Sequence, residues 1–197
     1  DPLPGRDGEP GLGHVPVLLG EVLALAAPAA GRRILDCTLG LGGHSQALLA
    51  AGASVWGIDR DPQARACAQQ RLQPFAPRFT ALAGDFAQVC QDLAAAGERF
   101  DAVLADLGVS SLQLDDEQRG FGLRSGRPLD LRMDPTSGEP AAALIARLDD
   151  TELADLIWRY GEERLSRRIA RALKAAVAAG HDSGQACAEA VRAVVRG

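Results

Sequence analysis

The residues best suited to bind or transform a ligand are four aspartates, each of which closes or follows a short apolar run: Asp36, Asp59, Asp85 and Asp106. A glycine-rich turn, 37–43, follows the first of them and leads into a helical pattern. Strand, glycine turn and helix in this order are typical of the place where an α/β sheet receives a nucleotide-like ligand. The spacing is not a clean G-x-G-x-x-G, however, and an ordinary tight turn between a strand and a helix has the same pattern.

The positions of the acids narrow the choice of ligand. Asp59, at the end of the second apolar run, suits hydrogen bonds from ribose hydroxyls, which a nicotinamide dinucleotide and S-adenosylmethionine both offer. Asp106, after the fourth run, faces the reacting group, where a dehydrogenase needs no acid. No G-x-x-x-x-G-K-[ST] motif is present, and a ring of carboxylates tolerates a sulfonium but repels a pyrophosphate. Methyl transfer is therefore favoured over dinucleotide oxidoreduction, although a helix N-cap remains the alternative role for any single acid.

A parallel sheet is needed to bring these side chains together. Apolar runs alternate with helical patterns at a spacing that predicts helices on the faces of such a sheet. Asp61 is expected to cap one helix, with Pro62 at its first position. We expect strands at 33–36, 54–58, 79–82 and 100–105, and helices at 14–27, 45–51, 62–72 and 86–96.

The alternation stops after the fourth strand. A loop with four arginines, 107–132, leads to a sequence that is helical from residue 139 onward, with a capping box expected at Asp149. One helical face shows apolar residues at every fourth position: Leu165, Ile169, Leu173 and Val177. The predicted organisation is a mobile tail, an α/β domain and a helical domain, at 1–13, 14–114 and 115–197.

Composition sets further limits. The chain has 197 residues, of which 47% are hydrophobic and 24% charged, as in ordinary globular proteins. No apolar run approaches the roughly 18–20 residues of a membrane span, and no signal-like segment precedes the first element, so a cytoplasmic location without a membrane partner is expected. The four cysteines form no C-x-x-C pair and only three histidines are present, which predicts reduced thiols and no metal site.

Several long runs closely resemble the bacterial family of small-subunit (16S) ribosomal RNA cytosine-N4 methyltransferases. They are H-V-P-V-L-L-G-E-V, D-C-T-L-G-L-G-G-H-S, G-I-D-R-D-P, G-D-F, D-L-G-V-S-S-L-Q-L-D-D-E-Q-R-G-F, R-P-L-D-L-R-M-D-P and Y-G-E-E-R-L-S-R-R-I-A-R-A. The resemblance covers nearly everything from His14 to about Lys174. It implies a class I (Rossmann-like) methyltransferase sheet with a helical insertion domain after the fourth strand. Members of the family continue with further strands, so the sheet is expected to be incomplete at its C-terminal side.

The resemblance also implies a donor, an acceptor and a set of contacts. The donor is S-adenosylmethionine, and the acceptor is the N4 amine of a decoding-site cytidine in the 16S RNA. Asp106 and the backbone after it are expected to form the wall where donor and amine meet. By frequency alone, Phe86 is a core residue and His44 a surface residue at a helix start. The cofactor contacts implied by position are Gly42, Gly43, His44, Asp59, Phe86, Asp106 and Gln113.

The net charge of −5 argues against nonspecific binding of nucleic acid by the chain as a whole. Residues 159–174 nevertheless contain six basic and two acidic side chains. We expect this segment, with the arginines of the loop 119–132, to contact RNA phosphates, although a solvated helix face is the alternative. The candidate RNA contacts on the helix are Arg164, Arg167, Arg168, Arg171 and Lys174.

A second class of function follows from the incomplete sheet. If the later strands are missing, the strand 100–105 is an exposed edge that can pair with another chain. The alternative to an active enzyme is therefore a catalytically inactive cofactor-binding or interaction protein of the same family, with a homodimer through this edge as one arrangement.

Overall fold

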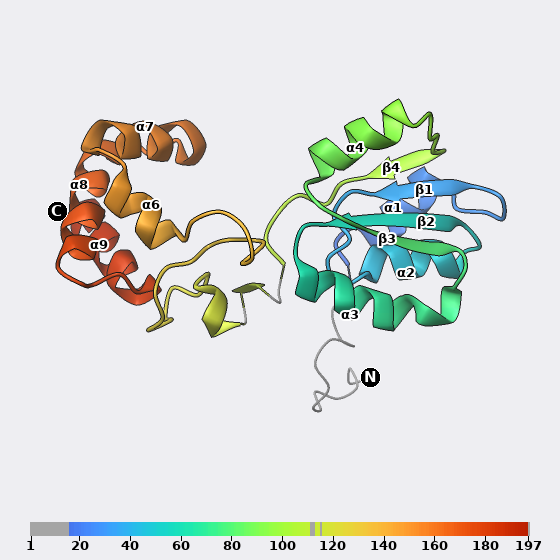
Figure 1. Ribbon diagram of the computed structural model, residues 1–197, viewed down its shortest axis with the longest axis horizontal. Helices are drawn as coiled ribbons and strands as arrows, with labels where there is room; N and C mark the ends of the chain where they lie inside the picture. The colour runs from blue at the N-terminus through green and yellow to red at the C-terminus, as the bar shows by residue number, and fades with distance from the viewer. Residues whose placement is uncertain (1–15, 111–112, 115, 197) are drawn as a thin grey trace. The chain divides into compact units, whose positions relative to one another are not determined.

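The computed structural model describes residues 16–110, 113–114 and 116–196 (Figure 1). The chain divides into two compact units, one that ends at Gly108 and one that begins at Val109. The tail expected at 1–13 and the start of the helix expected at His14 lie outside the described residues.

The first unit is built on a parallel four-stranded sheet in the order β3-β2-β1-β4 (Figure 1). Its strands are β1 (Arg33–Asp36), β2 (Ser54–Asp59), β3 (Phe79–Ala83) and β4 (Ala102–Leu104). In the register of the sheet, Leu35 of β1 lies opposite Trp56 of β2 and Val103 of β4. The expected Rossmann-like α/β class is thereby confirmed. β4 is shorter than the 100–105 expected, because its pairing with the short β1 spans only three residues.

The helices of this unit cover both faces of the sheet, and they are α1 (Leu19–Ala26), α2 (Gly43–Ala50), α3 (Pro62–Leu72), the 3₁₀ turn η1 (Gln73–Phe75) and α4 (Phe86–Ala95). Side chains alternate along a strand, so Ile34 packs with α2 and α3 while Leu35 packs with α4. The α3 N-cap is confirmed, since the Asp61 side chain accepts hydrogen bonds from Gln63 N at 3.0 Å and Ala64 N at 3.5 Å.

The first helix differs from the expectation of 14–27. It begins only at Leu19, because Leu18 has a φ of +52° and so cannot belong to a right-handed helix. Leu18 and Leu25 are 64% and 87% exposed, so neither leucine packs on the core. A helix of about two turns buries only a narrow stripe, which here consists of Leu23 and Ala26.

The second unit is helical, with η2 (Glu117–Arg119), α6 (Ala141–Arg147), α7 (Asp150–Gly161), α8 (Ser166–Ala178) and α9 (Gly184–Arg196). The capping box at the start of α7 is confirmed: Asp149 accepts from Glu152 N at 2.8 Å, and the Glu152 side chain accepts from Asp149 N at 3.0 Å. Ile145, Leu153, Ala154 and Ala170 form its buried core. No helix in the described ranges is long and apolar enough to cross a membrane.

β4 forms one edge of the four described strands, and Val103 at its centre is 64% exposed. An unpaired strand edge is a template for another strand. No finding supports the homodimer that such an edge suggested, and pairing through it stays a prediction.

The segment 117–140 has little regular structure, yet it is held firmly against the start of α9. Leu129 N donates to Asp182 O at 2.8 Å, and Gln185 N donates to Ser125 O at 3.0 Å. Gly120 lies within this segment at a φ of +71°, and a Cβ there would be 2.7 Å from Asp130 N and 2.9 Å from Pro128 O. Only glycine fits, because the neighbouring atoms belong to backbone that hydrogen bonds hold in place.

Gly120→Ala is therefore expected to destabilise the second unit. The left-handed conformation costs an alanine about 1–2 kcal/mol, and the clash adds about 1–3 kcal/mol. Gly126→Ala is the matched control, because a Cβ at Gly126 meets nothing within 4 Å. Urea unfolding measures both variants, and equal midpoints would contradict the prediction.

Candidate functional site

The glycine turn lies between β1 and α2 and is fastened to the end of β2. Leu39 N donates to Ile58 O at 2.9 Å, and Gly40 N donates to the Asp59 carboxylate Oδ2 at 2.8 Å. Gly40 and Gly42 have φ values of +51° and +79°, a region that glycine enters without strain. The hydrogen bond to Asp59 thus fixes the position of the turn at the carboxyl end of the sheet.

The three glycines of the turn have different surroundings. A Cβ on Gly42 would lie 3.1 Å from Leu72 Cδ1, and one on Gly43 would lie 2.8 Å from Pro16 Cγ. A Cβ on Gly40 would meet nothing closer than Thr38 O at 3.9 Å. Packing within the unit therefore requires Gly42 and Gly43, and Gly40 has open space beside its Cα. Contacts of Gly42 and Gly43 with a cofactor stay predictions.

Asp36 is an internal contact of the fold. Its side chain is 1% exposed; Oδ2 accepts from Ser45 Oγ at 2.6 Å, and Oδ1 accepts from Thr38 N at 3.1 Å. Burial raises the pKa of Asp36, and the hydrogen bonds from Ser45 and Thr38 oppose that rise. Thr38 and Ser45 were not expected to matter here, although an acceptor two residues before Thr38 N is a recognisable Asx-turn pattern.

Asp36→Asn is expected to reduce the pH dependence of stability. Because the pKa of Asp36 is raised above 3.8 in the folded state, its contribution to the free energy of unfolding is complete below that value and is lost as pH rises through the folded-state pKa. Asparagine keeps an acceptor for Thr38 N, supplies a donor to Ser45 Oγ and does not ionise. Urea unfolding between about pH 4 and pH 7 should show a steeper decline for the wild type. Parallel curves would contradict this.

Asp59 lies at the end of β2, as expected, and is partly buried. Besides Gly40 N, its carboxylate accepts from Asp61 N, which reaches Oδ1 at 2.9 Å. Each carboxylate oxygen has two lone pairs, so each retains one acceptor position. Asp59 is thus able to hold the turn and to accept two further hydrogen bonds.

The third strand leads to a capping acid and an open aromatic ring. Asp85 is the N-cap of α4, accepting from Ala87 N at 2.9 Å, and it pairs with Arg60 at 2.8 Å. A helix N-cap was the alternative role for each of the four acids, and Asp85 has that role. Phe86 is 40% exposed, so the core position that frequency favours is wrong and the ring is open to a ligand.

Asp106 and His44 face each other beside the turn. The backbone N of Asp106 donates to Thr38 Oγ1 at 2.7 Å, and its side chain is 51% exposed. No hydrogen bond from a described residue reaches the Asp106 carboxylate, which distinguishes it from Asp36, Asp59 and Asp85. His44 Nδ1 lies 3.9 Å from Asp106 Oδ2.

His44 is 8% exposed, so the surface position that frequency suggested is wrong. Its Nε2 lies 2.9 Å from Val17 O, and because a carbonyl only accepts, Nε2 carries the proton. His44 therefore joins the segment before α1 to the wall of the site, a contact that no sequence pattern indicates.

Gln113 belongs to the second unit, where it is buried and forms a local hydrogen-bonded turn. Ser110 N donates to Gln113 Oε1 at 3.0 Å, and Gln113 N donates to Ser110 Oγ at 3.3 Å. Its contact with a cofactor stays a prediction.

The basic residues expected to contact RNA fall into two groups. Arg164, Arg167, Arg168 and Arg171 are exposed, and no described carboxylate lies within 4 Å of their guanidinium groups. Lys174 is half-buried and donates to Leu148 O and, at 3.5 Å, to Ile145 O. It therefore caps the C-terminus of α6 and differs from the four arginines.

The arginines of the loop 119–132 also fall into a structural group and an exposed group. Arg119 is 6% exposed and donates to Arg132 O at 3.2 Å and Met133 O at 2.7 Å. Arg132 forms a two-pronged ion pair with Asp130, through Nε at 2.7 Å and a terminal nitrogen at 2.8 Å. Those two arginines hold the loop together, whereas Arg124 and Arg127 are exposed.

The carboxyl ends of the strands thus gather a glycine turn with one open face, an acid with free acceptor positions, an open aromatic ring and an exposed carboxylate. Ligands of open α/β sheets bind at this edge. Fold and site together define a Rossmann-like α/β protein with a candidate nucleotide-type site.

Comparison with known proteins narrows this class. The model of the MraW methylase family matches residues 11–196, and the chain belongs to that family. A ribosomal RNA small subunit methyltransferase H from Sorangium cellulosum is 50% identical over 187 residues, which are 93% of this chain and 58% of the relative. The protein of that name from Myxococcus xanthus is 52% identical over 164 residues, 83% of this chain and 53% of the relative. The chain spans little more than half the length of these relatives.

Solved structures show a weaker likeness. A SAM-dependent methyltransferase from Thiobacillus denitrificans, solved with S-adenosyl-L-homocysteine, has a TM-score of 0.36 and 16% identity, covering 90% of this chain and 85% of that chain. A likeness of this strength adds nothing to the strand order and register described above.

Proposed function

We propose that this chain carries the cofactor-binding part and an RNA-contacting part of an S-adenosylmethionine-dependent methyltransferase. The acceptor is the N4 amine of a cytidine in small-subunit ribosomal RNA. Membership of the MraW methylase family and the names of the relatives support the class of reaction. The observation that carries the proposal is the Asp106 carboxylate, which is half exposed beside the glycine turn and accepts no hydrogen bond from the described residues.

The residues present suit this cofactor. The free acceptor positions of Asp59 match ribose hydroxyls, the open ring of Phe86 offers a face to adenine, and Gly40 leaves room for close approach. Neighbouring carboxylates favour a cationic sulfonium and repel a pyrophosphate. When bound, S-adenosylmethionine supplies an electrophilic methyl group.

The protein then has to position a weak nucleophile. The N4 lone pair of cytosine is delocalised into the ring, and a hydrogen bond from the amine to Asp106 favours the pyramidal form that attacks. Fixing the amine in line with the methyl group can supply about 7–11 kcal/mol of the barrier. The target base has to leave its stack to reach such a site, and the four exposed arginines of the helical unit hold the flanking phosphates.

Two measurements test the proposal on the 197-residue chain. Calorimetric titration should show binding of S-adenosylmethionine and none of NAD. Transfer of labelled methyl groups to small ribosomal subunits should place the label on cytidine N4, with the Sorangium cellulosum relative as positive control. Label on another base or on protein would overturn the assignment of the acceptor.

The exposed edge of β4 favours a second candidate. With Val103 64% exposed, that edge can accept a strand from another chain, and the unit would then serve as a cofactor-binding or interaction module without turnover. Binding of S-adenosylmethionine with no methyl transfer by this chain would favour this candidate.

A further inference from the structure

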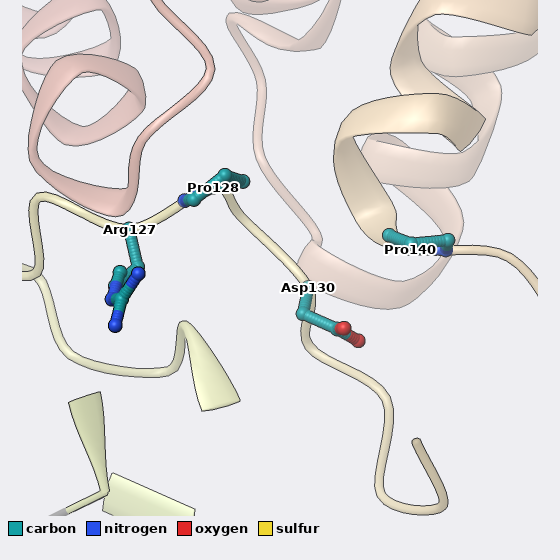
Figure 2. A pocket seen from close by; sticks show the side chains of 4 residues that line it. All are labelled: Arg127, Pro128, Asp130 and Pro140. Atoms are coloured by element: carbon teal, nitrogen blue, oxygen red, sulfur yellow. The ribbon is translucent and has the colours of Figure 1, made fainter. Parts of the chain in front are cut away.

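A cavity of about 290 Å³ in the second unit has no role in the function proposed above (Figure 2). It is lined by Arg127, Pro128, Asp130 and Pro140. Pockets for small ligands typically measure about 300–1,000 Å³, so this pocket lies at the lower limit of that range and has room for at most one small group, such as a single nucleotide that stays partly in solvent.

The backbone of the lining is held by hydrogen bonds from two helices and the loop before one of them. Arg127 O accepts from Gly184 N at 3.2 Å, Leu129 N donates to Asp182 O at 2.8 Å, and Asp130 O accepts from Ala141 N at 2.7 Å. The Pro128 and Pro140 rings restrict the backbone further. A cavity whose walls are formed in advance binds a ligand without the cost of ordering a loop.

The lining offers a cation and a carboxylate. Arg127 is exposed, and no carboxylate in the described part of the chain lies within 4 Å of its guanidinium. Arg132 hydrogen-bonds Asp130 and keeps the pKa of that carboxyl low, so Asp130 is ionised. Its Oδ1 receives two bonds from Arg132 and its Oδ2 one, which leaves an acceptor position on Oδ2. In Figure 2 Pro128 lies between Arg127 and Asp130, and Pro140 lies on the far side of Asp130.

We propose that this cavity binds one nucleotide of the substrate RNA other than the target cytidine. Arg127 contacts the phosphate, the proline rings pack against the base, and Asp130 accepts a hydrogen bond from an exocyclic amine. With the exocyclic edge of the base facing Asp130, uracil would place a carbonyl oxygen against the carboxylate, so the cavity selects cytosine, adenine or guanine over uracil. The proposal rests on the proposed function in that it takes RNA as the substrate.

The test is a titration of the full ¹⁵N-labelled chain, followed by NMR at the amides of Leu129 and Ala141. Cytidine 5′-monophosphate should shift these signals and bind about fivefold more tightly than uridine 5′-monophosphate, as expected for one net hydrogen bond. Arg127→Ala should weaken binding of the cytidine nucleotide about tenfold, or about 1.4 kcal/mol. Arg124→Ala is the matched control, because Arg124 is an exposed arginine of the same segment outside the lining, and it should change the affinity less than about twofold.

Three results would overturn the proposal. Inorganic phosphate that causes the same shifts at the same concentration would indicate an anion site only. Equal effects of the two substitutions would indicate nonspecific attraction, and tighter binding of a zwitterionic amino acid would indicate a different ligand. The titration uses neither S-adenosylmethionine nor methyl transfer. A negative titration would therefore not contradict the proposed function. A negative methyl-transfer assay, in turn, would not affect the conclusion from the titration.

Discussion

Asp106→Asn is expected to lower the rate of methyl transfer by about 10²- to 10³-fold, the usual effect of removing one group that stabilises charge in a transition state. The amide keeps the size of the carboxylate but loses the charge that the proposed function assigns to holding the cytosine amine. The fold should be unchanged, because the wild-type carboxylate accepts no hydrogen bond from the described residues. Initial rates with labelled S-adenosylmethionine and small ribosomal subunits measure the effect, and urea unfolding checks the fold.

Asp85→Asn is the matched control for that substitution. Asp85 also follows a strand and is similarly exposed, at 44%, but its carboxylate is occupied by Ala87 N and Arg60. Its replacement should leave the rate nearly unchanged and cost at most about 1 kcal/mol of stability, through the lost ion pair with Arg60, because asparagine caps a helix about as well as aspartate. An Asp106→Asn protein with wild-type turnover and cofactor affinity would contradict the role assigned to Asp106.

Reversing two charges on α8, Arg167→Glu with Arg168→Glu, is expected to weaken binding of RNA and to flatten its salt dependence. Each phosphate contact contributes about 0.7–0.9 to the slope of log K against log salt, so losing two should reduce the slope by about 1.4–1.8. Both side chains are exposed and no carboxylate of a described residue lies within 4 Å of either guanidinium, so folding should not suffer. Fluorescence anisotropy of a labelled ribosomal RNA fragment over a series of salt concentrations gives the slope.

The control for this double variant makes the same change in net charge at two arginines outside α8. Arg99→Glu with Arg192→Glu alters one exposed arginine in each unit and leaves the face of α8 intact. If both double variants lower the slope equally, the net charge of the protein governs binding, and a specific role for α8 is wrong.

The parts of the fold that depend on local chemistry were predictable. Asp61 and Asp149 are caps because each acid precedes a helical pattern and its own side chain reaches the next backbone amides. The parallel order follows from strands that alternate with helices, together with the right-handed connections between them. The start of α1 was not predictable, because it depends on a positive φ at Leu18, a leucine that gives no such signal.

The position of the candidate site was predictable from the sequence, but the roles of its individual side chains were less so. The acids gather at one edge because parallel strands end there, but the sequence does not distinguish a buried acid from an open one. Asp36 is buried because the hydroxyl of Ser45, on α2, lies above it. Lys174 continues the spacing of the basic helix, yet contacts between helices place its ammonium on the carbonyls at the end of α6. Such contacts depend on tertiary packing and leave no local pattern.

The glycine turn has a consequence for engineering. Ala68 and Leu72 fill the space behind Gly42, and Pro16 fills the space behind Gly43, so the shape of the turn is set by the protein's own side chains. A redesign that accepts sulfonium donors with larger alkyl groups should therefore leave these glycines unchanged. Room has to come from side chains that face outward and lie outside the buried clusters.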